Sequence, residues 1–113
     1  MKTVLLITNS RRHQLLYEPG LKKYFTVDFR KGEKGATTKI DAVVYDMPDS
    51  HTTIDLRWLA TVEVPLVLLT PEDELQSLTG PKRKVLVYPV RVNQIIRALW
   101  ELGVRPEGGG LVR

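Results

Sequence analysis

The run Asp41-Ala-Val-Val-Tyr-Asp46 indicates the fold of this chain most clearly, because it is apolar without polar alternation and ends on a carboxylate. Three further runs are apolar without polar alternation: Lys2–Thr8, Pro65–Thr70 and Lys84–Tyr88. Strands without alternation are buried on both faces, which is the habit of parallel sheets. The segment Phe25–Phe29 alternates instead, as an edge strand does. The sequence therefore predicts five strands, four of which form the body of a parallel sheet.

The segments between the predicted strands carry helix signals. Ser10 can cap a helix that begins at Arg11, and Pro19-Gly20 predicts an interruption of that helix. A second helix is predicted over residues 51–62, where apolar residues recur every four positions. Both helices follow a strand directly, so each predicts a crossover from one strand to the next.

The second half of the chain gives two more helix signals. Thr70-Pro71-Glu72-Asp73-Glu74 combines a capping residue, a proline at the first helical position and acids at the positive end of the helix dipole. Gly80-Pro81 limits that helix to a short one. The last helix is predicted from about Arg91 to Leu102, with Gly103 as its C-terminal stop.

Residues 30–40 contain two glycines and no apolar period, so this segment predicts a loop where a second helix would otherwise stand. Strands that alternate with helices form a parallel sheet with both faces covered. We therefore predict an α/β fold, a three-layer doubly wound sheet of five parallel strands in the flavodoxin-like order 2-1-3-4-5. One domain should span residues 1–104, followed by a flexible C-terminal tail at 105–113.

The composition is that of one soluble domain. Hydrophobic residues make up 42% of the chain, which is enough for a core, and the absence of cysteine excludes disulfides and thiolate metal sites. No apolar run is long enough to span a membrane, and the chain starts on a strand rather than a signal peptide, so a cytoplasmic protein is expected. Few amide side chains and many charges fit a thermophile.

The net charge of +4 conceals a segregation along the chain. Residues 1–40 hold nine Lys or Arg against three Asp or Glu, residues 41–79 hold one against eight, and residues 80–113 hold seven against two. Such asymmetry can steer a charged partner, and it also fits a surface that is merely solvated. Basic clusters at 30–39 and at Lys82–Lys84 leave nucleic-acid binding open, although no aromatic residues are interleaved with them.

Three motifs in this order make the chain resemble the receiver domain of two-component response regulators, from residue 2 to about 104. They are Asp41-x4-Asp46, then Pro65–Thr70, then Val87-Tyr88-Pro89 followed by an amphipathic helix. The spans between these motifs are a few residues shorter than is usual in that family, and Met47-Pro48 follows the aspartate immediately.

The resemblance implies that Asp46 matches the aspartate that the family phosphorylates with the help of Mg²⁺. The acidic pair that holds the metal in the family is replaced by Asn9-Ser10, and the lysine that pairs with the phosphoryl group is replaced by Tyr88. An amide and a hydroxyl are poor Mg²⁺ ligands beside a single carboxylate, and tyrosine is uncharged at pH 7. We therefore expect a pseudo-receiver in which Asp46 is a phosphoacceptor remnant, with no catalytic residue, no metal site and no cofactor.

By the same resemblance, a pocket forms around Asp46 at the carboxyl ends of the strands. Its predicted residues are Asn9, Ser10, Thr70, Tyr88 and Pro89. Structural roles compete with functional ones here: Asp46 can accept bonds from nearby N–H groups, Thr70 can cap a helix, and Pro89 can shape a loop. Tyr88 can plug the pocket. His13 and His51 stand alone in the sequence, so neither is expected to bind a metal or to be catalytic.

The last helix carries the predicted interaction surface. The stripe expected in the core consists of Val92, Ile95, Leu99 and Leu102. Ile96 and Trp100 fall beside that stripe, where they either widen the core contact or form an aromatic anchor of the kind that interfaces use. Receiver domains often dimerise or bind partners through the face formed by their last two helices and last strand. By the resemblance, this face would hold Val92, Ile96 and Trp100.

We therefore expect a signalling or regulatory module that binds a protein partner, with a homodimer as one form of that interaction, rather than an enzyme. Three alternatives stay open at this point: an atypical receiver that is still phosphorylated on Asp46, a basic regulator that binds nucleic acid, and a domain that binds a small ligand at the same pocket.

Overall fold

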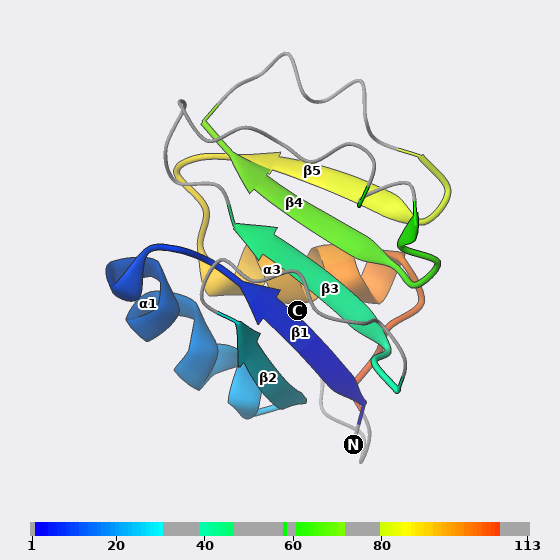
Figure 1. The fold of residues 1–113 in the computed structure, drawn as a ribbon, viewed down its shortest axis with the longest axis horizontal. Helices are drawn as coiled ribbons and strands as arrows, with labels where there is room; N and C mark the ends of the chain where they lie inside the picture. The colour runs from blue at the N-terminus through cyan, green and yellow to red at the C-terminus, as the bar shows by residue number, and fades with distance from the viewer. Residues whose placement is uncertain (1, 31–38, 47–57, 59–60, 72–79, 107–113) are drawn as a thin grey trace.

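A single parallel sheet forms the centre of the molecule (Figure 1). The computed structural model describes residues 2–30, 39–46, 58, 61–71 and 80–106. The strands are β1 (Thr3–Ile7), β2 (Thr26–Arg30), β3 (Ala42–Asp46), β4 (Leu66–Thr70) and β5 (Arg83–Val87). Their order across the sheet is β2-β1-β3-β4-β5, and every neighbouring pair is parallel. The predicted five-stranded order 2-1-3-4-5 is thereby confirmed.

Burial follows the position of each strand in the sheet. Every residue of β3 and of β4 is buried, because both strands have neighbours on either side and side chains above and below. The edge strand β2 is only partly buried, and β5, at the opposite edge, is half-buried along its whole length. The unbroken apolar runs of β1, β3 and β4 therefore mark the centre of the sheet, whereas the fourth such run, Lys84–Tyr88, forms the edge strand β5.

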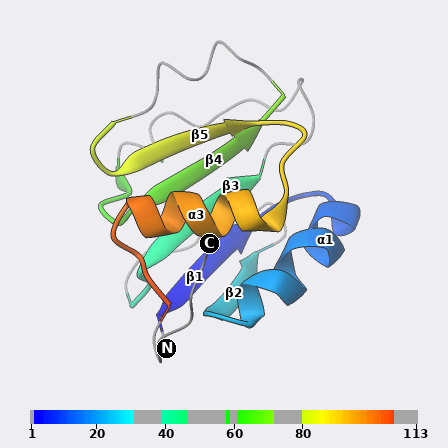
Figure 2. The ribbon, with the colours of Figure 1, turned by 180° about the vertical axis from the view of Figure 1, so that it is seen from behind.

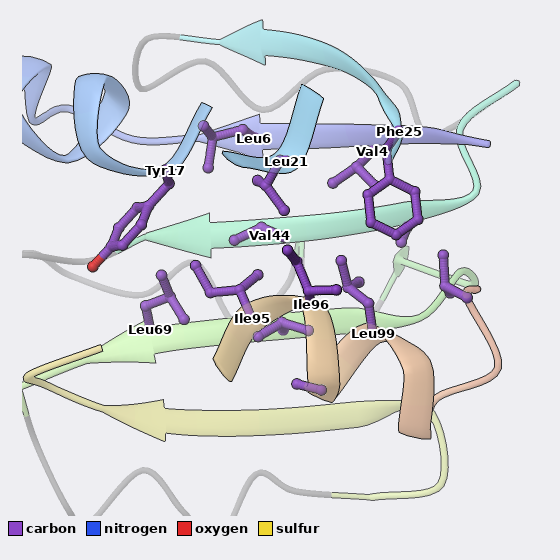
Figure 3. Packing of buried hydrophobic residues seen from close by; sticks show 14 of the residues in the cluster. Val4, Leu6, Tyr17, Leu21, Phe25, Val44, Leu69, Ile95, Ile96 and Leu99 are labelled. Atoms are coloured by element: carbon purple, nitrogen blue, oxygen red, sulfur yellow. The ribbon is translucent and has the colours of Figure 1, made fainter. Parts of the chain in front are cut away.

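The two described helices cover the same face of the sheet. They are α1 (Arg11–Lys22) and α3 (Val92–Glu101), and both lie in front of the strands when the molecule is turned around (Figure 2). Tyr17 and Leu21 of α1 meet Ile95 and Leu99 of α3 over the sheet (Figure 3). This face holds the larger of the two hydrophobic clusters.

The opposite face of the sheet carries a second hydrophobic cluster. Leu5 and Ile7 of β1 and Val43 and Tyr45 of β3 contribute to it from the sheet. Trp58 packs on this cluster, and its ring lies 5.8 Å from that of Tyr45. Most of the helix predicted over 51–62, most of the one predicted after Thr70, the centre of the 30–40 loop and most of the C-terminal tail lie outside the described residues.

Helix α1 begins where the sequence predicts and continues further. Ser10 caps it by accepting a hydrogen bond from the backbone N–H of His13 at 3.1 Å. The predicted interruption at Pro19 is wrong, because the helix continues through it to Lys22. Tyr17 before the proline and Leu21 after it lie one turn apart and are both buried. They hold the helix against the sheet on either side of Pro19. Tertiary packing thus outweighs the hydrogen bond that Pro19 cannot donate.

Helix α3 ends at Glu101, and Gly103 follows as the predicted C-terminal stop, with a φ of 89° that glycine adopts without strain. The N–H of Gly103 donates to the carbonyl of Trp100, and the N–H of Val104 donates to that of Leu99. These two bonds form a Schellman motif, and the buried side chains of Val104 and Leu99 belong to the same cluster. No helix in the described ranges is long and apolar enough to cross a membrane.

Candidate functional site

Asp46 is the last residue of β3, and its carboxylate lies at the carboxyl-terminal edge of the sheet. The strand that carries it is buried on both sides, and the side chain of Asp46 has no exposed surface. A buried carboxylate is costly unless hydrogen-bond donors surround it. The groups that contact Asp46 therefore define the site.

Three side chains donate hydrogen bonds to this carboxylate. The hydroxyl of Thr8 lies 2.6 Å from Oδ2, and Nδ1 of His13 lies 2.8 Å from the same oxygen. The hydroxyl of Tyr88 bonds to Oδ1. An ionised carboxylate can only accept, so when Asp46 is ionised this contact requires a proton on Nδ1 of His13. Both oxygens of Asp46 are thus occupied by groups of the chain itself.

The fold brings these three donors together from distant parts of the sequence. Thr8 directly follows β1, and Tyr88 directly follows β5. His13 lies in the first turn of α1, and the Ser10 cap fixes where that turn starts. The carboxyl ends of parallel strands share one edge of the sheet, which is where doubly wound folds place their functional groups.

Aromatic rings surround His13 and close the site. The imidazole of His13 meets the rings of Tyr17 and Tyr88 in edge contacts, with centroids 5.5 Å and 5.2 Å apart. The hydroxyl of Tyr17 donates to the carbonyl of Val90 at 3.1 Å, which joins α1 to the segment before α3. The side chain of His13 keeps 21% of its surface exposed. His13 and Tyr88 therefore contact each other as well as Asp46.

The burial of the site shifts the acidity of two groups. Burial raises the pKa of Asp46 above its ordinary value, while the hydrogen bond from Thr8 and the proximity of His13 act in the opposite direction. Burial, with the nearby charge of Asp46, also raises the pKa of Tyr17 to about 12. Tyr17 is therefore a neutral hydroxyl at physiological pH, and the negative charge of the cluster resides on Asp46 when that group is ionised.

Comparison with known proteins places this edge of the sheet in context. The sequence matches no family model, and no curated protein matches it. A response regulator receiver protein from Sinorhizobium medicae WSM419 has 21% sequence identity and a TM-score of 0.67, over 89% of this chain and 93% of that one. The chemotaxis protein CheY4 of Vibrio cholerae has 17% identity and a TM-score of 0.66, over 90% and 98%. The chain has the receiver fold.

A receiver fold implies Mg²⁺ beside its aspartate, so the groups near Asp46 can be assessed as ligands. Asn9 is exposed, and the hydroxyl of Ser10 is engaged in capping α1. Mg²⁺ requires several oxygen ligands in octahedral geometry, and both oxygens of Asp46 already accept hydrogen bonds. Within the described ranges, no three His, Cys, Asp or Glu side chains form a cluster that could hold a metal. This donor set does not fit Mg²⁺.

The predicted pocket residues of this receiver fold occupy different environments. Tyr88 contacts Asp46 directly, and its backbone N–H donates to the carbonyl of Thr70 at 3.0 Å. Thr70 is buried at the end of β4, and Pro89 is exposed and follows a cis peptide bond. Asn9 lines a cavity of about 200 Å³ together with Thr8 and with Phe29 of β2. Of the predicted set, Tyr88 therefore belongs to the cluster around Asp46.

The sequence pattern does not single out two partners of Asp46. His13 stands alone in the sequence, and Thr8 is the last residue of a predicted strand. The signal for Thr8 was its place at the end of the strand next to β3, where parallel strands align their last residues. The signal for His13 was its position three residues after the cap, because the first turn of α1 lies directly above that edge.

One of the three residues predicted to form an interface on α3 is buried in the folded chain. Ile96 is only 1% exposed and points into the core beside Leu99 (Figure 3), so it is not a surface residue of the folded chain. Trp100 is half-buried, and the guanidinium of Arg105 lies 4.9 Å from its ring centre. Val92 is half-buried against the larger cluster. The stripe of Ile96 and Trp100 thus divides between the core and a partly covered ring.

The basic residues around β5 lie at the end of the sheet opposite Asp46. Lys84 pairs with Glu101 of α3, and the ammonium of Lys82 bonds to the backbone carbonyl of Glu63 at 3.4 Å. The hydrogen bond from Lys84 lowers the pKa of Glu101 below its ordinary value. These contacts give Lys82 and Lys84 partners within the chain.

Proposed function

We propose that this protein is a signalling or regulatory module that acts by binding another protein and does not use phosphorylation of Asp46. The observation that carries the proposal is the set of hydrogen bonds to both oxygens of Asp46 from Thr8, His13 and Tyr88. The aspartate that the resemblance predicts is retained, but the side chains around it bond its carboxylate and thereby stabilise the folded chain.

The inaccessibility of Asp46 supports this proposal first. A carboxylate can attack phosphorus only if one oxygen reaches the phosphodonor along the line of the bond that breaks. The Asp46 side chain has no exposed surface, and its two oxygens accept hydrogen bonds from Thr8, His13 and Tyr88. Reaction would require at least one of these three hydrogen bonds to break.

The charge of the site supports it further. Phosphoryl transfer depends on cations that neutralise the charge on the transferred oxygens. Tyr88 stands where the resemblance places a lysine, and its hydroxyl is neutral at pH 7. Asn9 and Ser10 stand where the resemblance places the two metal-binding acids. Among the described residues, these positions therefore supply neither a lysine for the phosphoryl group nor a second carboxylate for Mg²⁺.

The proposed role as a signalling module rests on the fold alone. Two of the solved structures with this fold are a response regulator receiver protein and a chemotaxis protein. Folds host many functions, so this analogy supplies only the class of activity. The residues around Asp46 support directly only the second part of the proposal, which is that Asp46 is not phosphorylated.

Beryllofluoride with Mg²⁺ tests the proposal, because this complex mimics a phosphoryl group on a receptive aspartate. We expect the amide spectrum of the wild-type chain to remain unchanged around Asp46 and Thr70. The matched variant Asn9→Asp/Ser10→Asp/Tyr88→Lys supplies the missing groups, and aspartate retains the capping role of Ser10. We expect that variant to respond. A wild-type response that Asp46→Asn abolishes would contradict the proposal.

A further inference from the structure

A small cavity lies where the ends of β1 and β2 meet the start of α1. These two strands are neighbours in the sheet and run side by side toward the start of that helix (Figure 1). The cavity is on the β2 side of β1, whereas Asp46 ends β3 on the other side. Its lining among the described residues consists of Thr8, Asn9, Arg11, Gln14 and Phe29. The cavity therefore adjoins the cluster around Asp46 without including that carboxylate.

The volume of the cavity suits a single ring. It measures about 200 Å³, whereas a cavity of about 150 Å³ in a protein core holds one benzene molecule. Pockets that hold drug-sized ligands begin at about 300 Å³. The size therefore selects a ligand with one ring and a short polar substituent.

Phe29 gives the cavity an aromatic wall. Its side chain is half-buried and packs against the larger hydrophobic cluster. The backbone of Phe29 is fixed by pairing with Leu6 of β1, so the position of the ring is set by the sheet. Aromatic rings favour offset-stacked or edge contacts with one another, in addition to the burial of apolar surface. A planar aromatic ligand gains both contributions at this wall.

Arg11 brings a positive charge to the cavity. Its guanidinium is exposed, and no acid among the described residues forms an ion pair with it. The first turn of α1 also contains no acid, and a cation in that turn opposes the helix dipole. Helix stability therefore does not account for Arg11. A carboxylate does, because a guanidinium binds it through two parallel hydrogen bonds.

The other polar groups of the lining are uncharged amides. Asn9 is exposed, and the contact from Nε2 of Gln14 to Glu18 is 3.5 Å, which is long for a hydrogen bond. Both amides can therefore bond a polar substituent on a ring. Arg11 is the one cation among the described residues of the lining, and it neutralises one carboxylate. A phosphate monoester, with about two negative charges at pH 7, would keep one unpaired.

We propose that this cavity binds a monocyclic aromatic carboxylate, with its carboxylate on Arg11, its ring against Phe29 and a ring substituent on the amides of Asn9 and Gln14. The inference goes beyond the proposed function, because it adds a small-molecule site to a module that binds protein. Thr8 connects the two features of the structure. Its side chain lines the cavity, and its hydroxyl donates to Asp46 at 2.6 Å.

The test uses the full chain labelled with ¹⁵N and three probes: benzoate, 4-hydroxybenzoate and nicotinate. We expect saturable shifts of the amides of residues 8–14 and 26–30, with a dissociation constant on the order of 1 mM for ligands of this size. Benzamide has the ring of benzoate without its charge. We expect benzamide to bind at least about tenfold more weakly than benzoate, because the charge-assisted bonds to Arg11 are lost.

Variants separate this cavity from a general charge effect. Arg11→Gln should weaken benzoate binding on the order of tenfold or more. Arg12→Gln is the matched control, because it removes the same charge from the same turn at a residue outside the cavity lining. It should leave binding nearly unchanged. Phe29→Leu keeps an apolar wall and should weaken binding by the loss of the aromatic contact. Equal binding by the two arginine variants would overturn the inference.

The remaining outcomes also separate this inference from the proposed function. Absence of a saturable shift with all three carboxylates would overturn the ligand site, as would shifts centred on Lys82 and Arg83. Either result would leave the proposed function in place, because that function depends on Asp46. Phosphorylation of Asp46 would instead overturn the proposed function, and the result with the carboxylates would stand unchanged.

Discussion

The hydroxyl of Tyr88 donates a hydrogen bond to Oδ1 of Asp46 across the full width of β4. Asp46 ends β3 and Tyr88 follows β5, and β4 separates these two strands in the sheet. The bond therefore connects strands that share no backbone ladder. It also places a tyrosine ring, in edge contact with His13, over the one buried carboxylate among the described residues.

Replacing Tyr88 with phenylalanine should destabilise the fold. The ring would remain while Oδ1 of Asp46 loses its donor, and an unsatisfied buried acceptor costs about 1–3 kcal/mol. Urea unfolding should show a lower free energy of unfolding with an unchanged denaturant dependence. Tyr24→Phe is the matched control, because Tyr24 is also half-buried and packs against the core. Equal effects of the two changes would show that the hydroxyl of Tyr88 stabilises nothing.

The raised pKa of Asp46 gives a pH dependence of definite sign. Because the folded chain holds this proton more tightly than the unfolded chain, the free energy of unfolding falls as pH rises from the ordinary value of 3.8 through the folded pKa. The variant Asp46→Asn has no such proton. The stability difference, wild type minus variant, should therefore be largest in acid and decline with rising pH. Unfolding curves at several pH values check this, and a difference that grows with pH would contradict it.

The contact between Gly20 and Val92 sets the distance between α1 and α3. A Cβ atom at Gly20 would lie 2.8 Å from Cγ2 of Val92, closer than real Cβ contacts come. Gly20→Ala should therefore destabilise the fold by about 1–2 kcal/mol, although alanine is the better helix former. Adding Val92→Ala should recover stability, because it removes the opposing methyl groups. Thermal unfolding of the three variants forms a double-mutant cycle, and strictly additive losses would contradict the contact.

Ile96 is buried and Trp100 is half-buried, so truncation of these two side chains of α3 should destabilise the fold to different extents. Ile96→Ala removes a fully buried side chain and should cost about 2–5 kcal/mol. Trp100→Ala should cost less, since that ring is half-buried against Arg105. Chemical denaturation of both variants measures the difference. A larger loss for Trp100 would place that ring, rather than Ile96, at the centre of the packing.

The parts of the fold that could be predicted are those with a local physical signal. Unbroken apolar runs identified the buried strands, and Ser10 and Gly103 identified helix ends through their own chemistry. The continuation of α1 past Pro19 could not be predicted, because it depends on packing of Tyr17 and Leu21 against residues far along the chain. Propensity is a local quantity, and tertiary contacts override it.

The candidate site likewise contains residues that the sequence predicts and others that it does not. The resemblance placed Asp46 and Tyr88 near each other because both end strands of one sheet. His13 carried no pattern, because its role arises from the direction in which the first turn of α1 faces. A lone histidine in a sequence is indistinguishable from a surface residue until the fold places a carboxylate beside it.

Intact-protein mass spectrometry after incubation with acetyl phosphate and Mg²⁺ tests the central claim most directly. The wild-type chain should keep its mass, because Asp46 is enclosed by Thr8, His13 and Tyr88. The variant Asn9→Asp/Ser10→Asp/Tyr88→Lys, treated in parallel, serves as the comparison. A single phosphoryl adduct on the wild-type chain that disappears in Asp46→Asn would contradict the account.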